Sequence, residues 1–197
     1  MKNSIRSVFA AMLGMLLLLS VVMPANAAFV FNPDTNRWEE ATKRVSSARQ
    51  SSIPRTLVSY DTSLSAGSIV VETSERRLYY VLDNGKAMRY GIGVGRDGFR
   101  WSGRHRVTRK AEWPGWTPPP AMRRRQPGLP AYMPGGPDNP LGARALYIGS
   151  TLYRLHGTSE PWTIGQAVSS GCIRLTNDDI TDLYDRVRVG ALIVVNR

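Results

Sequence analysis

Short apolar runs separated by turn-forming residues dominate the pattern from residue 69 onward. The runs are residues 69–71, 78–82 and 88–94, and Asn84-Gly85 stands between the second and the third. Asn-Gly supports a tight hairpin because both turn positions tolerate positive φ. Short runs joined by tight turns are typical of a β-meander, so the pattern predicts three strands here. Val107-Thr108 is a candidate start for another strand.

Three further strand candidates lie nearer the C-terminus. Residues 145–148 and 152–155 are apolar runs on either side of Gly149-Ser150-Thr151, and residues 191–195 form a last β-branched run. The run at 152–155 ends directly before His156. The pattern therefore predicts that this histidine stands at the end of a strand.

One segment has the periodicity of a helix. Its apolar positions are spaced i, i+3, i+4 and i+7, and they are Ile180, Leu183, Tyr184 and Val187. This spacing gives one apolar helix face. Thr176-Asn177 is a candidate N-cap, and Asp178 and Asp179 fall in the first turn, where the helix dipole favours acids. The sequence thus predicts a mainly β fold with one helix near its C-terminal end.

Residues 113–142 interrupt this pattern of short apolar runs. Nine of the thirteen prolines lie there, and Gly115, Gly128, Gly135 and Gly136 are interleaved with them. Proline fixes φ and lacks an N–H group, so the segment cannot be an interior strand or a long helix. Trp113, Trp116 and Tyr132 supply apolar surface for packing, which favours an ordered loop over disorder. Whether this loop borders a site or is a plain surface loop stays open at this point.

The N-terminal region has the pattern of an exported protein. Lys2 and Arg6 precede an apolar run at 8–23, and Pro24-Ala25-Asn26-Ala27 offers small residues for cleavage. This order predicts a signal peptide over residues 1–27 and a periplasmic or cell-envelope location. The alternative is an uncleaved anchor, because the run is about as long as the shortest spanning helices.

The following segment, residues 28–66, is polar and poor in large apolar residues. It is predicted to be a linker or an N-terminal arm. Residues 67–197 are then left as the folded domain, and a chain of this length can bury a single core.

The charge favours a polyanionic partner without choosing one. The whole chain carries +11, and removing Lys2 and Arg6 with the signal leaves +9. Envelope polymers, anionic lipid and nucleic acid would all suit that charge. Export argues against nucleic acid, and no zinc-finger spacing or basic helical stripe appears. Two histidines and one cysteine give no closed zinc set, so neither a metal nor a cofactor is expected.

Cys172 is the single cysteine of the chain. In an oxidising compartment a lone thiol is either reactive or intermolecular. His156 precedes it by sixteen positions, which allows a strand to end, loop back and return. Because a thiol attacks as thiolate, we hypothesise that Cys172 is a nucleophile and His156 its base. The alternative is a buried structural thiol.

The residues around Cys172 suggest further roles. The N–H groups of Cys172 and Gly171, with Ser170, are candidate donors to an oxyanion, and a glycine lets substrate approach the backbone. Arg174 carries a guanidinium fork that suits a carboxylate. Its alternative is a salt bridge to Asp178 or Asp179.

The stretch from His156 to Arg174 resembles the active-site signature of the bacterial L,D-transpeptidases, the family with the YkuD-like catalytic domain. The resemblance rests on H-G-T at 156–158, a following glycine, and S-x-G-C-I-R at 169–174. Residues 91–95 and 116–119 also read like that family, and the likeness extends over residues 67–197. Ser170 stands where many members have a histidine, so the chain lacks a second imidazole beside the nucleophile.

The resemblance implies a fold and a set of site residues. The fold would be a single L,D-transpeptidase-like β-sandwich domain, with one helix near its C-terminal end and residues 113–142 as a flap beside the groove. The catalytic residues would be Cys172, His156, Gly157 (through its backbone carbonyl) and Gly171. The substrate-binding residues would be Arg174, Ser169, Ser170, Thr158 and Trp116. For Ser169 and Thr158, local turn-stabilising roles are the alternative.

The resemblance also implies a reaction. Cys172 would attack the bond after the third residue of a peptidoglycan tetrapeptide stem, release D-alanine and form a thioester. An amine from a second stem, or from an envelope protein, would then resolve the thioester, and a carbapenem would acylate the same thiol. Two alternatives remain: a carboxypeptidase or hydrolase with water as acceptor, and a non-catalytic wall-binding module.

Overall fold

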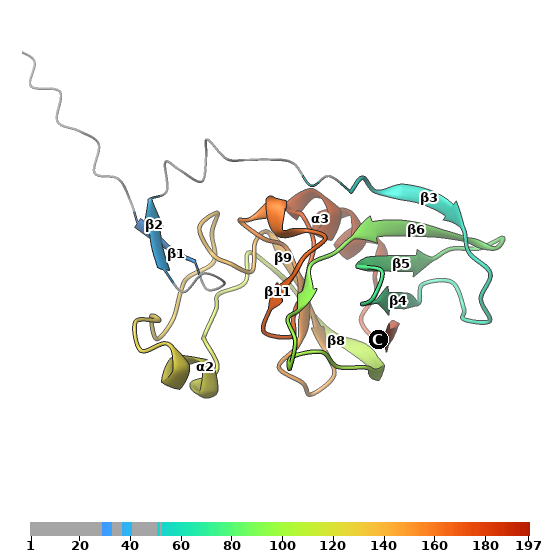
Figure 1. Cartoon of the computed structure of the whole chain (residues 1–197). Helices are drawn as coiled ribbons and strands as arrows, with labels where there is room; N and C mark the ends of the chain where they lie inside the picture. The colour runs from blue at the N-terminus through green and yellow to red at the C-terminus, as the bar shows by residue number, and fades with distance from the viewer. Residues whose placement is uncertain (1–28, 33–36, 41–50, 52) are drawn as a thin grey trace, which may run out of the picture.

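The computed structural model describes residues 29–32, 37–40, 51 and 53–197 (Figure 1). The predicted signal peptide therefore lies outside the described residues. Within those ranges, no helix is long and apolar enough to cross a membrane. Two strands, β1 (Phe29–Asn32) and β2 (Arg37–Glu40), pair with each other in antiparallel fashion.

Nine strands form one sheet in the order β12-β10-β9-β8-β13-β4-β5-β6-β3. They are β3 (Thr56–Ser59), β4 (Ile69–Glu72), β5 (Arg77–Val81), β6 (Lys86–Gly91), β8 (Gly103–Glu112), β9 (Arg144–Ile148), β10 (Arg154–His156), β12 (Ile173–Arg174) and β13 (Leu192–Asn196). Two short strands, β7 (Val94–Gly95) and β11 (Ala167–Ser169), form a separate parallel pair. The helices in the described part of the chain are α2 (Pro120–Arg125), α3 (Asn177–Arg186) and the 3₁₀ turn η1 (Pro161–Thr163). The prediction of a mainly β fold is confirmed.

The predicted meander forms the β3 side of the sheet. Strands β4, β5 and β6 pair in antiparallel fashion, and the β5–β6 hairpin turns through Asn84 and Gly85 with φ of 59° and 64°. Strand β3 then pairs with β6, placing Leu57 opposite Met88. This strand lies inside the segment predicted as a linker, so that prediction does not hold for residues 56–59. These residues are ordered because they pair with β6, which lies about thirty positions further along the chain. Local composition does not reveal such a partner.

Strand β8 joins the two halves of the sheet. Its first part pairs with β13 and its second part with β9, and the register shifts between Val107 and Arg109. A strand that changes partner at a bulge lets a sheet turn a corner. The two halves consequently share one buried core, in which Ile69, Leu78, Tyr90, Leu146, Ile148 and Leu155 meet Ile180 and Leu183 of α3.

Helix α3 is the helix that the periodicity predicts. The side chain of Thr176 accepts a hydrogen bond from the N–H of Asp179 at 3.1 Å, as expected of an N-cap. Ile180 and Leu183 are fully buried against the sheet. Capping and one apolar face together fix the helix at the residues where the sequence places it.

Residues 113–142, which we call the flap, are ordered around a small apolar cluster of their own. The cluster consists of Trp116, Leu129 and Leu141, with Met122 and Met133 packed against it. Asn139 is buried; its amide donates to the carbonyls of Met133 (3.2 Å) and Pro134 (2.8 Å), and its carbonyl accepts from the N–H of Leu141 (2.9 Å). The flap holds only the six-residue helix α2, which confirms the prediction of an ordered segment without a long helix.

Candidate active site

Two short parallel strands bring the predicted site residues together. Strand β10 pairs with β12 so that Leu155 lies opposite Ile173 and His156 opposite Arg174. Side chains alternate along a strand, and Leu155 and Ile173 point into the core with at most 1% exposure. Extending the register by one position places Cys172 beside Arg154. The outer face of this ladder therefore presents Arg154, His156, Cys172 and Arg174, and all four line one pocket.

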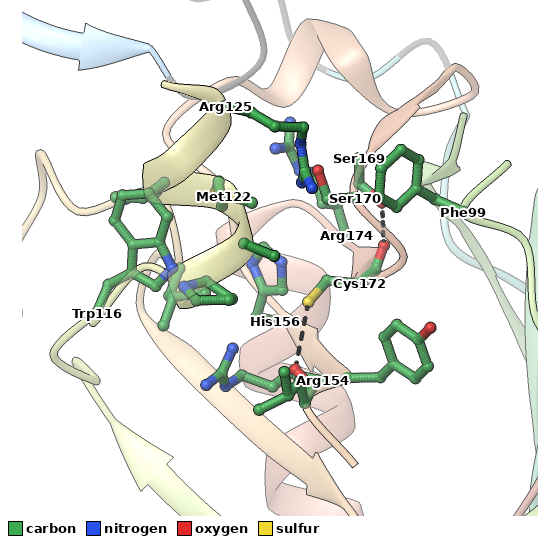
Figure 2. Close-up of a pocket in the computed structure, with 16 residues that line it drawn as sticks. Phe99, Trp116, Met122, Arg125, Arg154, His156, Ser169, Ser170, Cys172 and Arg174 are labelled. Atoms are coloured by element: carbon green, nitrogen blue, oxygen red, sulfur yellow. Dashed lines mark hydrogen bonds between the residues drawn. The ribbon is translucent and has the colours of Figure 1, made fainter. Parts of the chain in front are cut away.

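This pocket has a volume of about 360 Å³ and lies between the ladder and the flap. Figure 2 shows Cys172 and His156 projecting into it side by side. Trp116 and Met122 line the opposite wall, which belongs to the flap. The structure thus brings together the thiol and the imidazole that the sequence placed sixteen positions apart.

The imidazole of His156 is held in a defined orientation. Its Nδ1 lies 2.6 Å from the carbonyl oxygen of Gly157. A carbonyl oxygen only accepts, so Nδ1 carries the hydrogen, and Nε2 is the basic nitrogen of the neutral ring. This is the contact that the resemblance implies for Gly157. A Cβ on Gly157 would collide with Oδ1 of Asn177, so the position requires glycine.

The loop before Cys172 is held by Ser169. The Ser169 hydroxyl donates to the carbonyl of Cys172 at 2.6 Å and accepts from the N–H of Gly171 at 3.1 Å. That N–H is therefore engaged inside the loop, and the expectation that Gly171 donates to an oxyanion is not supported. The N–H of Cys172 remains the candidate donor, and Ser170 lines the pocket beside it. The contacts of Ser169 favour its alternative role, that of stabilising the turn.

Gly171 is nevertheless constrained by its surroundings. Its φ is +106°, and a Cβ there would collide with the ring of Tyr153. Trp101 donates from Nε1 to the Gly171 carbonyl at 2.7 Å and stacks on Tyr153 with ring centroids 4.5 Å apart. Sequence reasoning missed Trp101 and Tyr153, because no local pattern connects either residue with position 171.

Arg174 is paired inside the protein. A nitrogen of its guanidinium lies 3.5 Å from a carboxylate oxygen of Glu160, and both side chains are at most 6% exposed. The partner is thus neither Asp178 nor Asp179. A buried cation requires such a partner, because burying an unpaired charge is costly. The sequence offered no sign of Glu160, which caps the 3₁₀ turn η1.

Of the two remaining predicted substrate contacts, Trp116 lines the pocket and Thr158 does not. Thr158 is buried, accepts from the N–H of Glu160 at 3.0 Å and is not among the residues that line the pocket, which favours its turn-stabilising alternative. Trp116 lines the pocket and exchanges two backbone hydrogen bonds of 2.8 Å with Met133. Among the described residues, no group of three or more His, Cys, Asp or Glu is arranged to hold a metal ion.

Comparison with known proteins identifies the family. The sequence profile of the YkuD family, described as the L,D-transpeptidase catalytic domain, matches residues 66–195. This chain belongs to that family. The probable L,D-transpeptidase ErfK/SrfK of Escherichia coli (strain K12) is 45% identical over 157 residues, covering 76% of this chain and 49% of that protein. The chain thus spans about half the length of the curated relatives it matches.

Solved structures agree on the fold. An L,D-transpeptidase from Mycobacterium tuberculosis H37Rv is 19% identical with a TM-score of 0.52, and the match covers 67% of this chain and 58% of that one. A Brucella melitensis structure described as a probable carnitine operon oxidoreductase is 39% identical, with a TM-score of 0.52 over 77% of this chain and 97% of that one. In this chain, Gly91 ends β6, Gly93 lies between β6 and β7, and Gly95 ends β7. Strand β8 follows them, so these glycines do not form the strand–turn–helix dinucleotide fingerprint.

Proposed function

We propose that this chain is an exported, cysteine-dependent L,D-transpeptidase that acylates itself on a peptidoglycan tetrapeptide stem. The observation that carries the proposal is that the Cys172 thiol and the His156 imidazole line one pocket, with the imidazole oriented by the Gly157 carbonyl at Nδ1. Membership of the L,D-transpeptidase catalytic-domain family supports the substrate class. The signal-peptide pattern of residues 1–27 supports export.

The first half-reaction uses groups that already line the pocket. His156 Nε2 takes the proton of the Cys172 thiol, and the thiolate attacks the carbonyl carbon of the bond before the terminal D-alanine. The N–H of Cys172 stabilises the tetrahedral oxyanion. When the intermediate collapses, the carbon–nitrogen bond breaks, His156 returns the proton to the leaving amine, and a thioester on Cys172 remains.

The second half-reaction reverses the proton transfers. An amine of the acceptor attacks the thioester carbonyl, His156 accepts the proton of that amine, and the Cys172 sulfur leaves as a thiol. The acceptor is a second stem, which gives a 3–3 cross-link, or an amine of an envelope protein. Water in the same position would give a hydrolase, so the nature of the acceptor separates these two functions.

Mass spectrometry and product analysis test the proposal. Purified protein should gain the mass of one carbapenem, and Cys172→Ala should gain none. With a tetrapeptide stem, wild type should release D-alanine and form a cross-linked dimer, whereas Cys172→Ala should do neither. Tripeptide without dimer would identify a hydrolase. Sacculus binding without any turnover would instead identify a wall-binding module.

A further inference from the structure

A second arginine lies beside the proposed nucleophile, and it is not paired as Arg174 is. Arg154 sits next to Cys172 in the extended register of the β10–β12 ladder and lines the pocket. It is two residues before His156 on the same strand face. Among the described residues it makes no salt bridge, and its Nε is buried without a hydrogen-bond partner.

Comparison with Arg174 shows what differs. Both arginines project from the outer face of the ladder and line the same pocket. Arg174 is almost fully buried and paired with Glu160, so a carboxylate of the protein already balances its charge. The charge of Arg154 lacks such a balance, although its side chain is half-buried. An incoming anion therefore binds more favourably to Arg154 than to Arg174.

An aromatic ring holds Arg154 without neutralising it. Its guanidinium carbon lies 5.2 Å from the centroid of the Tyr147 ring, and that of Arg109 lies 3.5 Å from the same centroid. The three residues are cross-strand neighbours on β10, β9 and β8. A guanidinium beside a ring keeps its full charge and its donors, so Arg154 is positioned in advance for a planar anion.

The opposite side of the pocket carries another cation. Figure 2 shows Arg125 of the flap and Arg154 of β10 on either side of the Cys172 and His156 pair. Arg125 is exposed, lies 5.4 Å from the Phe99 ring and makes no salt bridge with any described residue. The pocket between them is lined mainly by apolar groups such as Trp116 and Met122. This distribution fits an extended peptide that carries carboxylates beside the reacting bond.

We propose that Arg154 binds a carboxylate of the donor stem next to the bond that Cys172 attacks, and that Arg174 does not. The inference rests on the proposed function and assigns the donor-binding role to a residue that the signature motif leaves out. Two parallel N–H···O bonds from the guanidinium fork would fix the carbonyl in line with the sulfur. Because the contact exists before the reaction begins, its loss should raise KM more than it lowers kcat.

Coupling between a variant and a modified donor tests this assignment. Donor stems are prepared with each carboxylate amidated in turn, and KM and kcat are measured for wild type, Arg154→Gln and Arg154→Lys. Arg154→Gln should raise KM for the free-acid donor about 10–100-fold, and Arg154→Lys should raise it less. Amidating the carboxylate that Arg154 binds should raise the KM of wild type by the same factor, and it should leave the KM of Arg154→Gln almost unchanged.

Arg109→Gln is the matched control, because Arg109 contacts the same ring and does not line the pocket. Its KM should stay within about twofold of wild type, and a loss as large as that of Arg154→Gln would overturn the assignment. The assignment would also be overturned if Arg154→Gln raised KM relative to wild type by the same factor with every amidated donor. Alkylation of Cys172 by neutral iodoacetamide should be equal in wild type and Arg109→Gln, which checks that the thiol is unchanged in the control. An enzyme that takes up a carbapenem and turns over stems without any coupling at Arg154 refutes this inference alone, whereas no adduct and no turnover refutes the proposed function.

Discussion

The two walls of the pocket are built in different ways. The strand wall belongs to the nine-stranded sheet, and Leu155 and Ile173 anchor it in the main core. The flap wall packs around a separate cluster of three buried residues, and its helix α2 buries none of its own side chains. Backbone ladders fix the strand wall, whereas Asn139 and the contacts within the small cluster fix the flap.

This difference assigns different tasks to the two walls. Reacting atoms must be held to within a fraction of an ångström, and packed strands supply such precision better than loops do. Cys172 and His156 both come from the strand wall, while the flap contributes apolar surface and one exposed arginine. Changes in the strand wall should therefore lower kcat, and changes in the flap should mainly raise KM.

The largest loss is expected from His156→Gln. Without an imidazole at this position the thiol keeps its proton, and acylation of Cys172 by a carbapenem should slow by about 10²–10⁴-fold. Stopped-flow spectroscopy measures that rate, and a melting curve checks that the variant is folded. His105→Gln is the matched control, because the other histidine lies outside the pocket. Equal rates for wild type and His156→Gln would remove the histidine from the mechanism.

Gly171→Ala should damage the strand wall through its backbone. The φ of +106° and the collision of a Cβ with Tyr153 should together lower the free energy of unfolding by about 1–3 kcal/mol. The displaced loop should lower kcat as well. Gly98→Ala is a useful comparison, since its φ is +82° but nothing lies within 4 Å of an added Cβ. Denaturant titration and steady-state kinetics measure both effects, and identical behaviour of the two variants would show that the Tyr153 contact is unimportant.

The strand wall was only partly predictable from sequence. The meander and α3 follow from local signals: Asn84-Gly85 for the hairpin, and the Thr176 cap with the apolar face for the helix. The parallel pairing of β10 with β12 does not, because β12 has two residues and its partner is far away in sequence. A faint signal exists in the polar–apolar–polar triplets at 154–156 and 172–174. Aligning these triplets would have placed Arg154 beside Cys172.

The flap was predictable only as an irregular, ordered segment. Its prolines exclude a ladder, and its aromatic residues indicate packing. Which groups meet inside it depends on Asn139, whose three side-chain hydrogen bonds are not predicted by any periodic pattern. Glu160 in the strand wall could not be predicted either. Its ion pair with Arg174 joins a turn to β12, and neither segment has a sequence pattern that indicates it.

Trp116→Ala tests the flap's half of the comparison. Trp116 is 5% exposed and contributes to both the flap cluster and the pocket lining. Its truncation should raise KM for the stem about 10–100-fold while kcat stays within a few-fold, because the Cys172 and His156 pair is untouched. Trp113→Ala is the matched control, since Trp113 is 43% exposed and does not line the pocket. A loss confined to kcat would show that the two walls do not divide their tasks in this way.

The smallest effect is expected outside both walls, at Asp182 on α3. The hydrogen-bonded guanidinium of Arg186 lowers the pKa of Asp182, and the hydroxyl of the buried Tyr90 donates to it at 2.6 Å. A depressed folded-state pKa stabilises the protein at pH values above the unfolded-state value of about 3.9, and this stability is lost as the pH falls. Asp182→Asn should therefore lower the free energy of unfolding by about 1 kcal/mol at pH 7.

Chemical denaturation across pH 7 to 3 checks the sign of this effect. The difference between wild type and Asp182→Asn should shrink as the pH falls through the unfolded-state value of about 3.9 toward the depressed folded-state value. Burial raises the pKa of neighbouring Asp179, but Asp179 is present in both proteins and largely cancels from the difference. Asp185→Asn, at an exposed position of the same helix, is the matched control. KM and kcat should be unchanged in both variants, because neither Asp182 nor its partners Tyr90 and Arg186 line the pocket. A change in kcat would show that α3 transmits its electrostatics to the strand wall.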